Sequence, residues 1–244
     1  TIELLGQRVG LAGNAAVDAS GALGGGAVLV GGDYQGKNAA LPNARQTFVG
    51  RDAVINANAT AGGDGGKVVV WSDEATRMHG AVSARGAQGG NGGLVETSGH
   101  YLDVAGARVD AGGGKAGGKS GTWLLDPYNI SVVNDPANPT PLDEAAQFEL
   151  GYSDVTYVDA ALISAATASA VLQARHDLSF DAAIRNTNGA GLTAQAGNDI
   201  NVNAALARAG GIRLTANDNA IGTASGSGAV NVNVNGSVSA GGRM

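Results

Sequence analysis

Four segments of this sequence share one pattern: a short apolar strand, a turn rich in glycine and a second apolar strand. They are VDASGALGGGAVLV (17–30), INANATAGGDGGKVVVW (55–71), VSARGAQGGNGGLVET (82–97) and VDAGGGKAGGKSGTWLL (109–125). The last three begin 27 residues apart, at Ile55, Val82 and Val109, whereas the first interval is 38 residues. An insertion around residues 35–43, which include Pro42, accounts for the longer interval. Short strands and turns that repeat at such a period are typical of a solenoid.

A related, shorter repeat occupies the second half of the chain. LQARHDLSFDAAI (172–184) aligns with LTAQAGNDINVNAAL (192–206), at an interval close to 22 residues. Residues 230–234 alternate Val with Asn, as in a strand that has one buried and one polar face, and stacked Asn side chains can form ladders. No amphipathic helix is long enough to make a βαβ crossover. The sequence therefore predicts an all-β solenoid, with coils of about 27 residues over 1–133 and of about 22 residues over 169–244.

The segment between the two repeats, residues 134–168, has a different composition. Four of the five prolines fall within residues 127–141, and residues 120–174 contain seven acids but no Lys or Arg. Thr140 followed by Pro141 reads as the start of a short helix over residues 141–150, and Asp159 reads as the N-cap of another. This segment is predicted to be an irregular, partly helical, acidic excursion from the solenoid.

Composition limits both the interior of the protein and its partners. The chain has 244 residues, of which 41 are Gly and only 4% are aromatic, so the interior has to consist of thin layers of Val, Leu, Ile and Ala. Because strand side chains alternate between faces, only one of Leu124 and Leu125 is expected to face the core. The absence of Cys excludes disulfides and thiolate metal sites. A net charge of −6 with scattered basic residues argues against nucleic acid, and no apolar run is long enough to span a membrane.

Residues 65–132 resemble the segment that comes after the secretion domain in filamentous-haemagglutinin-like exoproteins of two-partner secretion, including the high-molecular-weight adhesins. The resemblance is carried by VVVWSD (68–73), GNGGLVETSG (90–99) and, most specifically, GTWLLDPYNI (121–130). It extends over residues 1–133 and, less closely, over 160–244. It implies a right-handed parallel β-helix that serves as a stalk.

The resemblance also implies how the protein is exported and what it does. A protein of this family is secreted through an outer-membrane pore partner and stays at the bacterial cell surface or is released. It takes part in adhesion, biofilm formation, virulence or host-cell contact, and its receptor is a carbohydrate or a host or bacterial surface protein. Some relatives carry a toxin at the tip. Because neither end of the sequence shows a polar cap, we expect the chain to be a fragment of a longer rod.

No residue is predicted to be catalytic. Asp73 and Glu74 are adjacent carboxylates after Trp71, and a glycosidase needs two such groups across a groove, but the aromatics that would bind sugar are not clustered. We expect the pair to lie at a solvated corner of a coil. The histidines, which are His79, His100 and His176, lack metal-ligand spacing and are expected at the surface or in turns. Neighbouring strand residues point to opposite faces, so His176 and Asp177 are not expected to interact without a turn.

The excursion is the predicted place for any binding function. Its acids are either solvated or hold Ca²⁺ through carboxylate oxygens, and the candidate metal ligands are then Asp143, Glu144 and Glu149. No other cofactor is expected. Its aromatic residues, which are Phe148, Tyr152 and Tyr157, are the candidate ligand contacts.

Three classes of function remain open. A structural stalk or adhesive segment without catalysis agrees with every feature of the sequence. The alternative is a module that binds a carbohydrate or a host protein through residues 134–168, or the stalk of a contact-dependent toxin. A polysaccharide-processing enzyme is the third, and it requires carboxylates that converge in a cleft.

Overall fold

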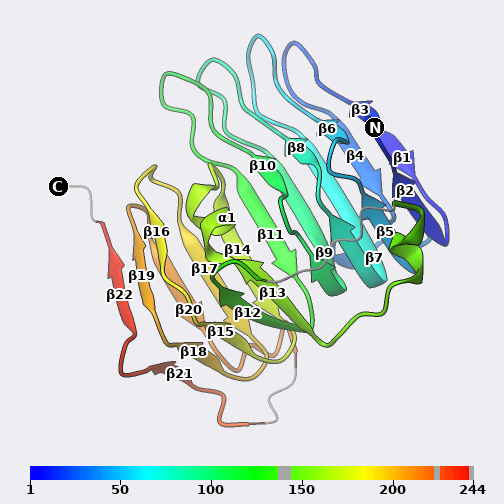
Figure 1. Ribbon diagram of the computed structural model, residues 1–244. Coiled ribbons are helices and arrows are strands. Elements are labelled where there is room, and N and C mark those ends of the chain that lie inside the picture. Colours follow the sequence, from blue (N-terminus) through cyan, green and yellow to red (C-terminus); the bar gives the residue numbers. More distant parts are fainter. Residues whose placement is uncertain (137–143, 223–225, 242–244) are drawn as a thin grey trace.

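A computed structural model describes residues 1–136, 144–222 and 226–241. Strands are the predominant regular secondary structure of the described chain, and every pairing between its named strands is parallel. Successive strands stack on one another along the molecule, from the N-terminal end to the C-terminal end (Figure 1). This arrangement is compatible with an all-β solenoid.

The largest sheet, hereafter the long sheet, runs the length of the molecule. Its strands lie in the order β1 (Ile2–Leu4), β4 (Ala27–Val30), β7 (Lys67–Met78), β9 (Leu94–Asp103), β11 (Thr122–Asp126), β14 (Ser169–Ala174), β17 (Leu192–Ala196) and β20 (Ile212–Thr215). β2 (Arg8–Leu11) and β5 (Gln46–Val49) belong to the same sheet, and β5 pairs with the second half of β7.

Three smaller sheets form the other walls. The first contains β3 (Ala16–Asp18), β6 (Val54–Asn56), β8 (Ala81–Ser83) and β10 (Arg108–Asp110). The second contains β13 (Val155–Asp159), β12 (Asn129–Val133), β15 (Leu178–Phe180), β18 (Ile200–Val202) and β21 (Val230–Val232). The third contains β16 (Ile184–Asn186), β19 (Ala205–Arg208) and β22 (Ser237–Ala240). The helical elements are η1 (Tyr34–Gly36), η2 (Glu144–Glu149) and α1 (Ala160–Ala165).

One hydrophobic core extends through the coils, from Val9 to Leu206. Its layers consist of Val, Leu, Ile and Ala, with a few larger residues such as Trp123 and Phe180. As expected from strand alternation, only one of Leu124 and Leu125 faces the core, but the other is not exposed: both are nearly inaccessible. Leu125 belongs to the core, whereas Leu124 does not, which shows that the outer face of the long sheet is covered at this point.

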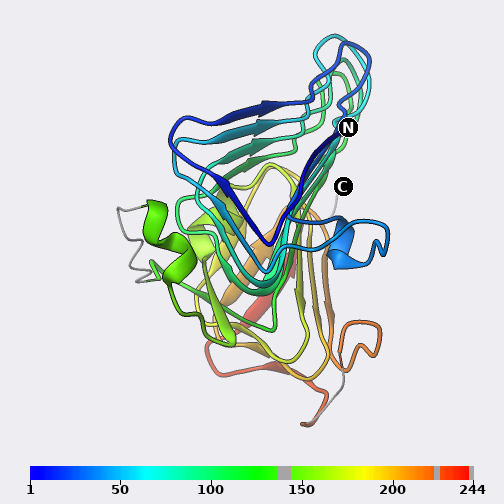
Figure 2. The same ribbon diagram turned by 90° about the vertical axis from the view of Figure 1, so that its right-hand side faces the viewer.

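Columns of glycine explain the Gly-Gly pairs before β4, β7 and β9 and the single Gly121 before β11. A Cβ atom on Gly66 would overlap the carbonyl oxygen of Gly26, one on Gly93 would overlap that of Gly66, and one on Gly121 would overlap that of Gly93. The backbones of successive coils approach each other too closely here for any side chain. The loops before these glycines project together from one side of the molecule (Figure 2).

The excursion is partly built into the stack. β13 pairs with β12 over five residues, from Asn129↔Val155 to Val133↔Asp159, and also contacts β9, so it lies between these two strands. Asp159 caps α1 by accepting a hydrogen bond from the Ala161 amide, which confirms the predicted N-cap. Of the helix predicted over residues 141–150, the described part, Glu144–Glu149, is a 3₁₀ helix; Asp143 lies outside the described residues.

Before β13, the excursion runs back along the outside of the earlier coils. Glu144 Oε2 accepts a hydrogen bond of 2.7 Å from the Gly13 amide, and Glu149 forms an ion pair of 3.1 Å with Arg8. Arg77 Nη2 donates to the carbonyl oxygens of residues 150 and 151. Residues 144–151 therefore form a strap that joins the first coil to the third, and η2 lies beside β5 (Figure 1).

Candidate functional site

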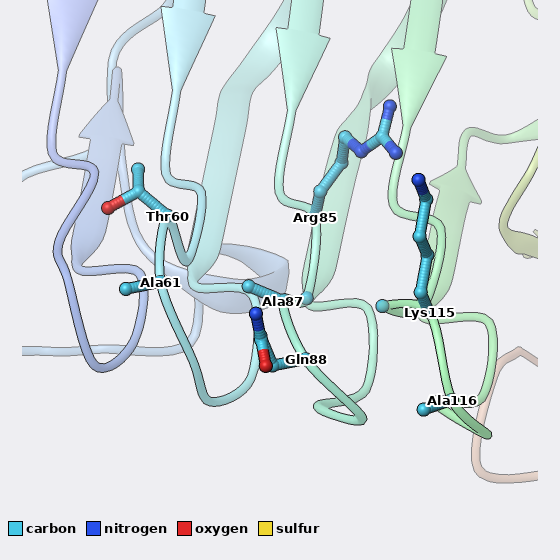
Figure 3. Close-up of a pocket in the computed structure, with 9 residues that line it drawn as sticks. Thr60, Ala61, Arg85, Ala87, Gln88, Lys115 and Ala116 are labelled. Carbon is cyan, nitrogen blue, oxygen red and sulfur yellow. The ribbon is translucent and has the colours of Figure 1, made fainter.

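A hollow of about 490 Å³ lies between the glycine-rich loops. Thr60, Arg85, Gln88 and Lys115 line it, and the Arg85 and Lys115 side chains extend in the same direction from neighbouring loops (Figure 3). Arg85 forms an ion pair of 3.1 Å with Asp110. These charged side chains are exposed, so water screens them, and the hollow offers no buried polar group that would orient a ligand.

Two of the residues that line this hollow have a left-handed backbone conformation, which the geometry of the turns explains. Gln88 (φ 45°) and Ala116 (φ 70°) lie at equivalent tips of successive loops, and each precedes a glycine that also has a positive φ. The Gly90 amide donates to the Ala87 carbonyl oxygen at 2.9 Å, which closes the turn around Gln88. The strain at these residues therefore serves the fold and does not point to a ligand site.

A smaller, more polar cavity of about 230 Å³ lies on the outer face of the long sheet. Its lining residues are Trp71, Asp73, Gly99, His100, Asp126 and Arg175. Strand register explains their proximity, because Trp71 of β7 pairs with Ser98 of β9 and Ser98 pairs with Asp126 of β11. Its volume is below the range of about 300 to 1,000 Å³ typical of pockets that bury drug-sized ligands.

A loop covers the sheet beside this cavity. The loop contains η1, and Asp33 caps η1 by accepting a hydrogen bond from the Tyr34 amide. Leu41 packs on an apolar cluster of the outer face that consists of Leu29, Val69 and Trp71. The loop coincides with the insertion predicted around residues 35–43, and it explains why so much of the outer face is buried.

Two carboxyl groups lie under or beside this loop. Glu96 is fully buried, and burial raises its pKa to about 8, although the hydrogen bonds from the Gln35 amide oppose the shift. Burial also raises the pKa of Asp126 to about 6, against the lowering effect of Arg175 and Lys37. Sequence reasoning missed both residues; the signal available was an acid inside the apolar strand runs LVET and WLLD.

The carboxylates that the sequence did single out do not converge. Asp73 Oδ1 accepts hydrogen bonds from Asn43 Nδ2 at 2.9 Å and from Trp71 Nε1 at 3.1 Å. Glu74 instead forms an ion pair of 2.7 Å with Arg45. Each side chain has its own partners, and Glu74 does not line the cavity that Asp73 lines.

A column of rings runs along the stack next to the polar cavity. His100 stacks on Tyr128 with ring centroids 5.0 Å apart, and Tyr128 stacks on His176 at 5.9 Å. His100 Nε2 lies 2.7 Å from a carboxylate oxygen of Asp154, in the excursion. His176 Nδ1 lies 2.8 Å from Asp177 Oδ2, and these neighbours meet because the chain bends here, which is the condition expected for such an interaction.

His79 also departs from the expectation of a surface residue. It is buried, its ring packs edge-on against Phe48, and its Nε2 lies 3.1 Å from Asp103 Oδ2. Burial alone would raise the pKa of Asp103, but His79 and the Ala105 amide outweigh this effect and the pKa is lowered. Both side chains are shielded from solvent, and the pair has a structural role in the core.

The predicted ligand contacts are spread over several coils. Phe148 lies against Gly10 and under the Arg8 guanidinium, in the first coil. Tyr152 stacks on Tyr101 with centroids 6.3 Å apart, while Tyr157 is 45% exposed on β13. No contact joins these three aromatic residues in the described part of the chain.

The predicted metal ligands also have other partners. Glu144 and Glu149 are bound to the first coil through the strap, and Asp143 lies outside the described residues. No group of three or more His, Asp or Glu side chains that could hold a metal ion occurs within residues 1–136, 144–222 and 226–241.

Comparison with known proteins gives no assignment, since no family model and no curated protein matches the chain. In the described residues, no helix has the length and apolar character needed to cross a membrane.

Proposed function

We propose that this chain is a structural stalk or adhesive segment of a large secreted bacterial surface protein, similar to the filamentous-haemagglutinin-like exoproteins of two-partner secretion. Its coils form a right-handed parallel β-helix. The parent protein is exported through an outer-membrane pore partner and contacts a carbohydrate or a surface receptor. The observation that carries the proposal is the single core that runs through the parallel stack from Val9 to Leu206.

A continuous parallel stack suits a spacer for a physical reason. Each coil is held by its two neighbours through a row of backbone hydrogen bonds. Further coils can therefore be added to the stack with the same kind of contact. The offset between paired residues is 27 between β7 and β9, as at Lys67↔Leu94, and 22 between β14 and β17, as at Gln173↔Gln195. It differs between other strands, because the connecting loops differ in length. The separate partners of Asp73 and Glu74 favour a role without catalysis.

Duplication of one coil tests the stalk proposal. Ala170 pairs with Leu192, so residues 170–191 make one complete coil, and a second copy is inserted after Gly191. A stalk accepts the insertion: the rod becomes longer by about 4.8 Å, measured by small-angle X-ray scattering, and still melts cooperatively. Insertion of the same residues in shuffled order is the control and should unfold the second half. An aggregated or molten product from the true duplicate would contradict the stalk proposal.

A second candidate, a ligand-binding module in the excursion, is favoured by one observation. Tyr152 and Asp154 of the excursion meet His100 and Tyr101 of β9 beside the polar cavity. Binding of the purified chain to a glycan array and to epithelial cells would test it, with Tyr152→Ala as the variant and Tyr157→Ala as the control. Loss of binding in both variants or in neither would argue against this site.

A further inference from the structure

The loop over the outer face of the long sheet is fixed at both ends. The Gly31 amide donates to the Leu4 carbonyl oxygen at 2.8 Å, and the Ala44 carbonyl oxygen accepts from the Asp73 amide at 2.9 Å. Residues 33–41, which we call the latch, lie between these anchors and rest on the sheet through side chains and one backbone amide. The latch stands out on the side of the coils opposite η2 (Figure 2).

Gln35 connects the latch to both buried carboxyl groups of the sheet. Its backbone amide donates to both carboxyl oxygens of Glu96, at 3.0 and 3.1 Å. Its side-chain Nε2 donates to Gln173 Oε1 at 2.8 Å and lies 3.4 Å from Asp126 Oδ2. Gln35 has φ 54° and ψ 23°, a left-handed conformation that costs a non-glycine residue about 1 kcal/mol or more. The closed position therefore depends on these contacts to offset the strain.

The surroundings of Glu96 contain acids but no cation. Its neighbours across the sheet, Val69 of β7 and Leu124 of β11, are apolar. The Gln35 amide donates to both carboxyl oxygens of Glu96. The acidic groups that face it are Asp126 from β11 and Asp33 from the latch, and Tyr34 of the latch also lies near.

The nearby cations form contacts with groups other than Glu96, or they favour the ionised form of Asp126. Lys67 forms an ion pair of 2.6 Å with Asp33, which holds the pKa of Asp33 at about 2. Lys37 Nζ donates to Gln35 Oε1 at 2.7 Å, and Lys37 and Arg175 both favour the ionised form of Asp126. In the described part of the chain, nothing neutralises an ionised Glu96.

We propose that residues 33–41 form a pH-sensitive latch, which stays closed on the outer face of the long sheet while Glu96 is protonated and loosens when Glu96 and Asp126 are both ionised. Two adjacent buried carboxylates repel each other and require hydration. The easiest route for water is displacement of the latch, since the strands below are held by backbone pairing on both sides. Opening uncovers the apolar cluster of Leu29, Val69 and Trp71.

The direction of the switch is set by the two carboxyl groups. Both have a pKa above the ordinary value, about 6 for Asp126 and about 8 for Glu96. Below the lower value both are neutral and the latch is closed, and it loosens progressively as pH rises through the upper value. This inference does not depend on the proposed stalk function.

Fluorescence quenching by acrylamide tests the latch on the full chain without any label. The chain has two Trp residues: Trp71 lies under the latch and Trp123 lies in the core. Acrylamide is uncharged, so its access to Trp71 reports opening independently of pH. We expect the quenching constant of the wild type to rise at least twofold between pH 5 and pH 9. In Glu96→Gln the rise should disappear, and in Asp126→Asn it should become smaller and be complete at a lower pH, because the charge of Asp126 raises the pKa of Glu96.

Glu74→Gln is the matched control, because Glu74 is a carboxylate of β7 that is paired with Arg45 and does not contact the latch. The tryptophan fluorescence of this variant should be quenched to the same extent as that of the wild type at every pH. Far-UV circular dichroism at both pH values separates latch opening from unfolding, which would change the whole spectrum. Equal wild-type quenching at pH 5 and pH 9, or an unchanged rise in Glu96→Gln, would overturn the proposal.

Discussion

Glu96 shows how a single residue can control the stability of this protein. Its carboxyl group is buried between apolar neighbours on the outer face, where an acid is normally exposed. A neutral carboxyl group is tolerated at such a site, whereas a carboxylate without a cation is not. The residue therefore links local hydrogen bonding to pH.

The pH dependence of folding is the first prediction. The pKa of Glu96 is higher in the folded chain than its ordinary value of 4.5, so the folded state binds more protons than the unfolded state. Its stabilising contribution is complete below that ordinary value and is lost as pH rises through about 8. Urea unfolding should show the free energy of unfolding falling by about 2 to 4 kcal/mol between pH 5 and pH 9. Glu96→Gln should flatten this slope; an equally steep slope in the variant would assign it to other groups.

Burial on both faces of β11 gives the second prediction. Leu125→Ala removes a core side chain and should cost about 2 to 5 kcal/mol in free energy of unfolding. Leu124→Ala should also destabilise the protein, by about 1 to 3 kcal/mol, because Leu124 is buried on the covered face. Thermal melts of the two variants would measure both effects, and a Leu124→Ala variant as stable as the wild type would mean that the outer face is solvated here.

Close contact between the turns of successive coils requires glycine at fixed positions in the loops. The glycine columns let successive backbones approach, and the strands after them are thereby held in register. β13 has the opposite role, since it enters the stack out of chain order, between β9 and β12.

A pair of glycine substitutions tests the column, as the third prediction. A Cβ atom on Gly93 would collide with the backbone of Gly65 and Gly66, whereas Gly62 has no atom within 4 Å of such a Cβ. Gly93→Ala should lower the free energy of unfolding by about 1 to 3 kcal/mol, because the obstructing atoms belong to the backbone and cannot rotate away as a side chain can. Gly62→Ala should stay within about 0.5 kcal/mol of the wild type. Equal melting temperatures for the two variants would contradict this close packing of the coils.

Deletion of the excursion is the fourth prediction. Replacing residues 136–158 with a short Gly/Ser linker removes the strap and β13, including the fully buried Val158. We therefore expect a less cooperative melt by circular dichroism and a lower midpoint, as for loss of a structural joint. Val158→Ala is the smaller test of the same strand and should cost about 1 to 3 kcal/mol. A deletion variant that melts like the wild type would make the excursion a surface decoration.

Across the whole molecule, burial is uneven along the stack. β7, β9 and β11 are buried on both faces, whereas the strands of the last described coil are largely exposed. Val230, Val232 and Val238 each expose more than two fifths of their surface. Solenoid stability is a sum of contacts between neighbouring coils, so the isolated chain should not open uniformly.

Hydrogen exchange tests this gradient, as the fifth prediction. Amides of β20, β21 and β22 should exchange first, and those of β7, β9 and β11 last, because the strap and the latch reinforce the earlier coils. Mass spectrometry of peptic fragments would measure the order. Uniform protection along the chain would show that it opens as one cooperative unit.

The sequence alone determined the repeat and the local structure that the repeat specifies. Val and Leu at regular spacing before and after Gly-Gly pairs specify short strands at fixed intervals, and the Asp159 cap marks the start of a helix, because these signals are local or periodic. Tertiary structure alone decided what covers the outer face, where β13 enters the stack, and which acids are buried. Glu96 and Asp126 were not predicted because their burial depends on a loop about 60 and 90 residues earlier in the chain, at Gln35, and no pattern within either strand encodes that contact.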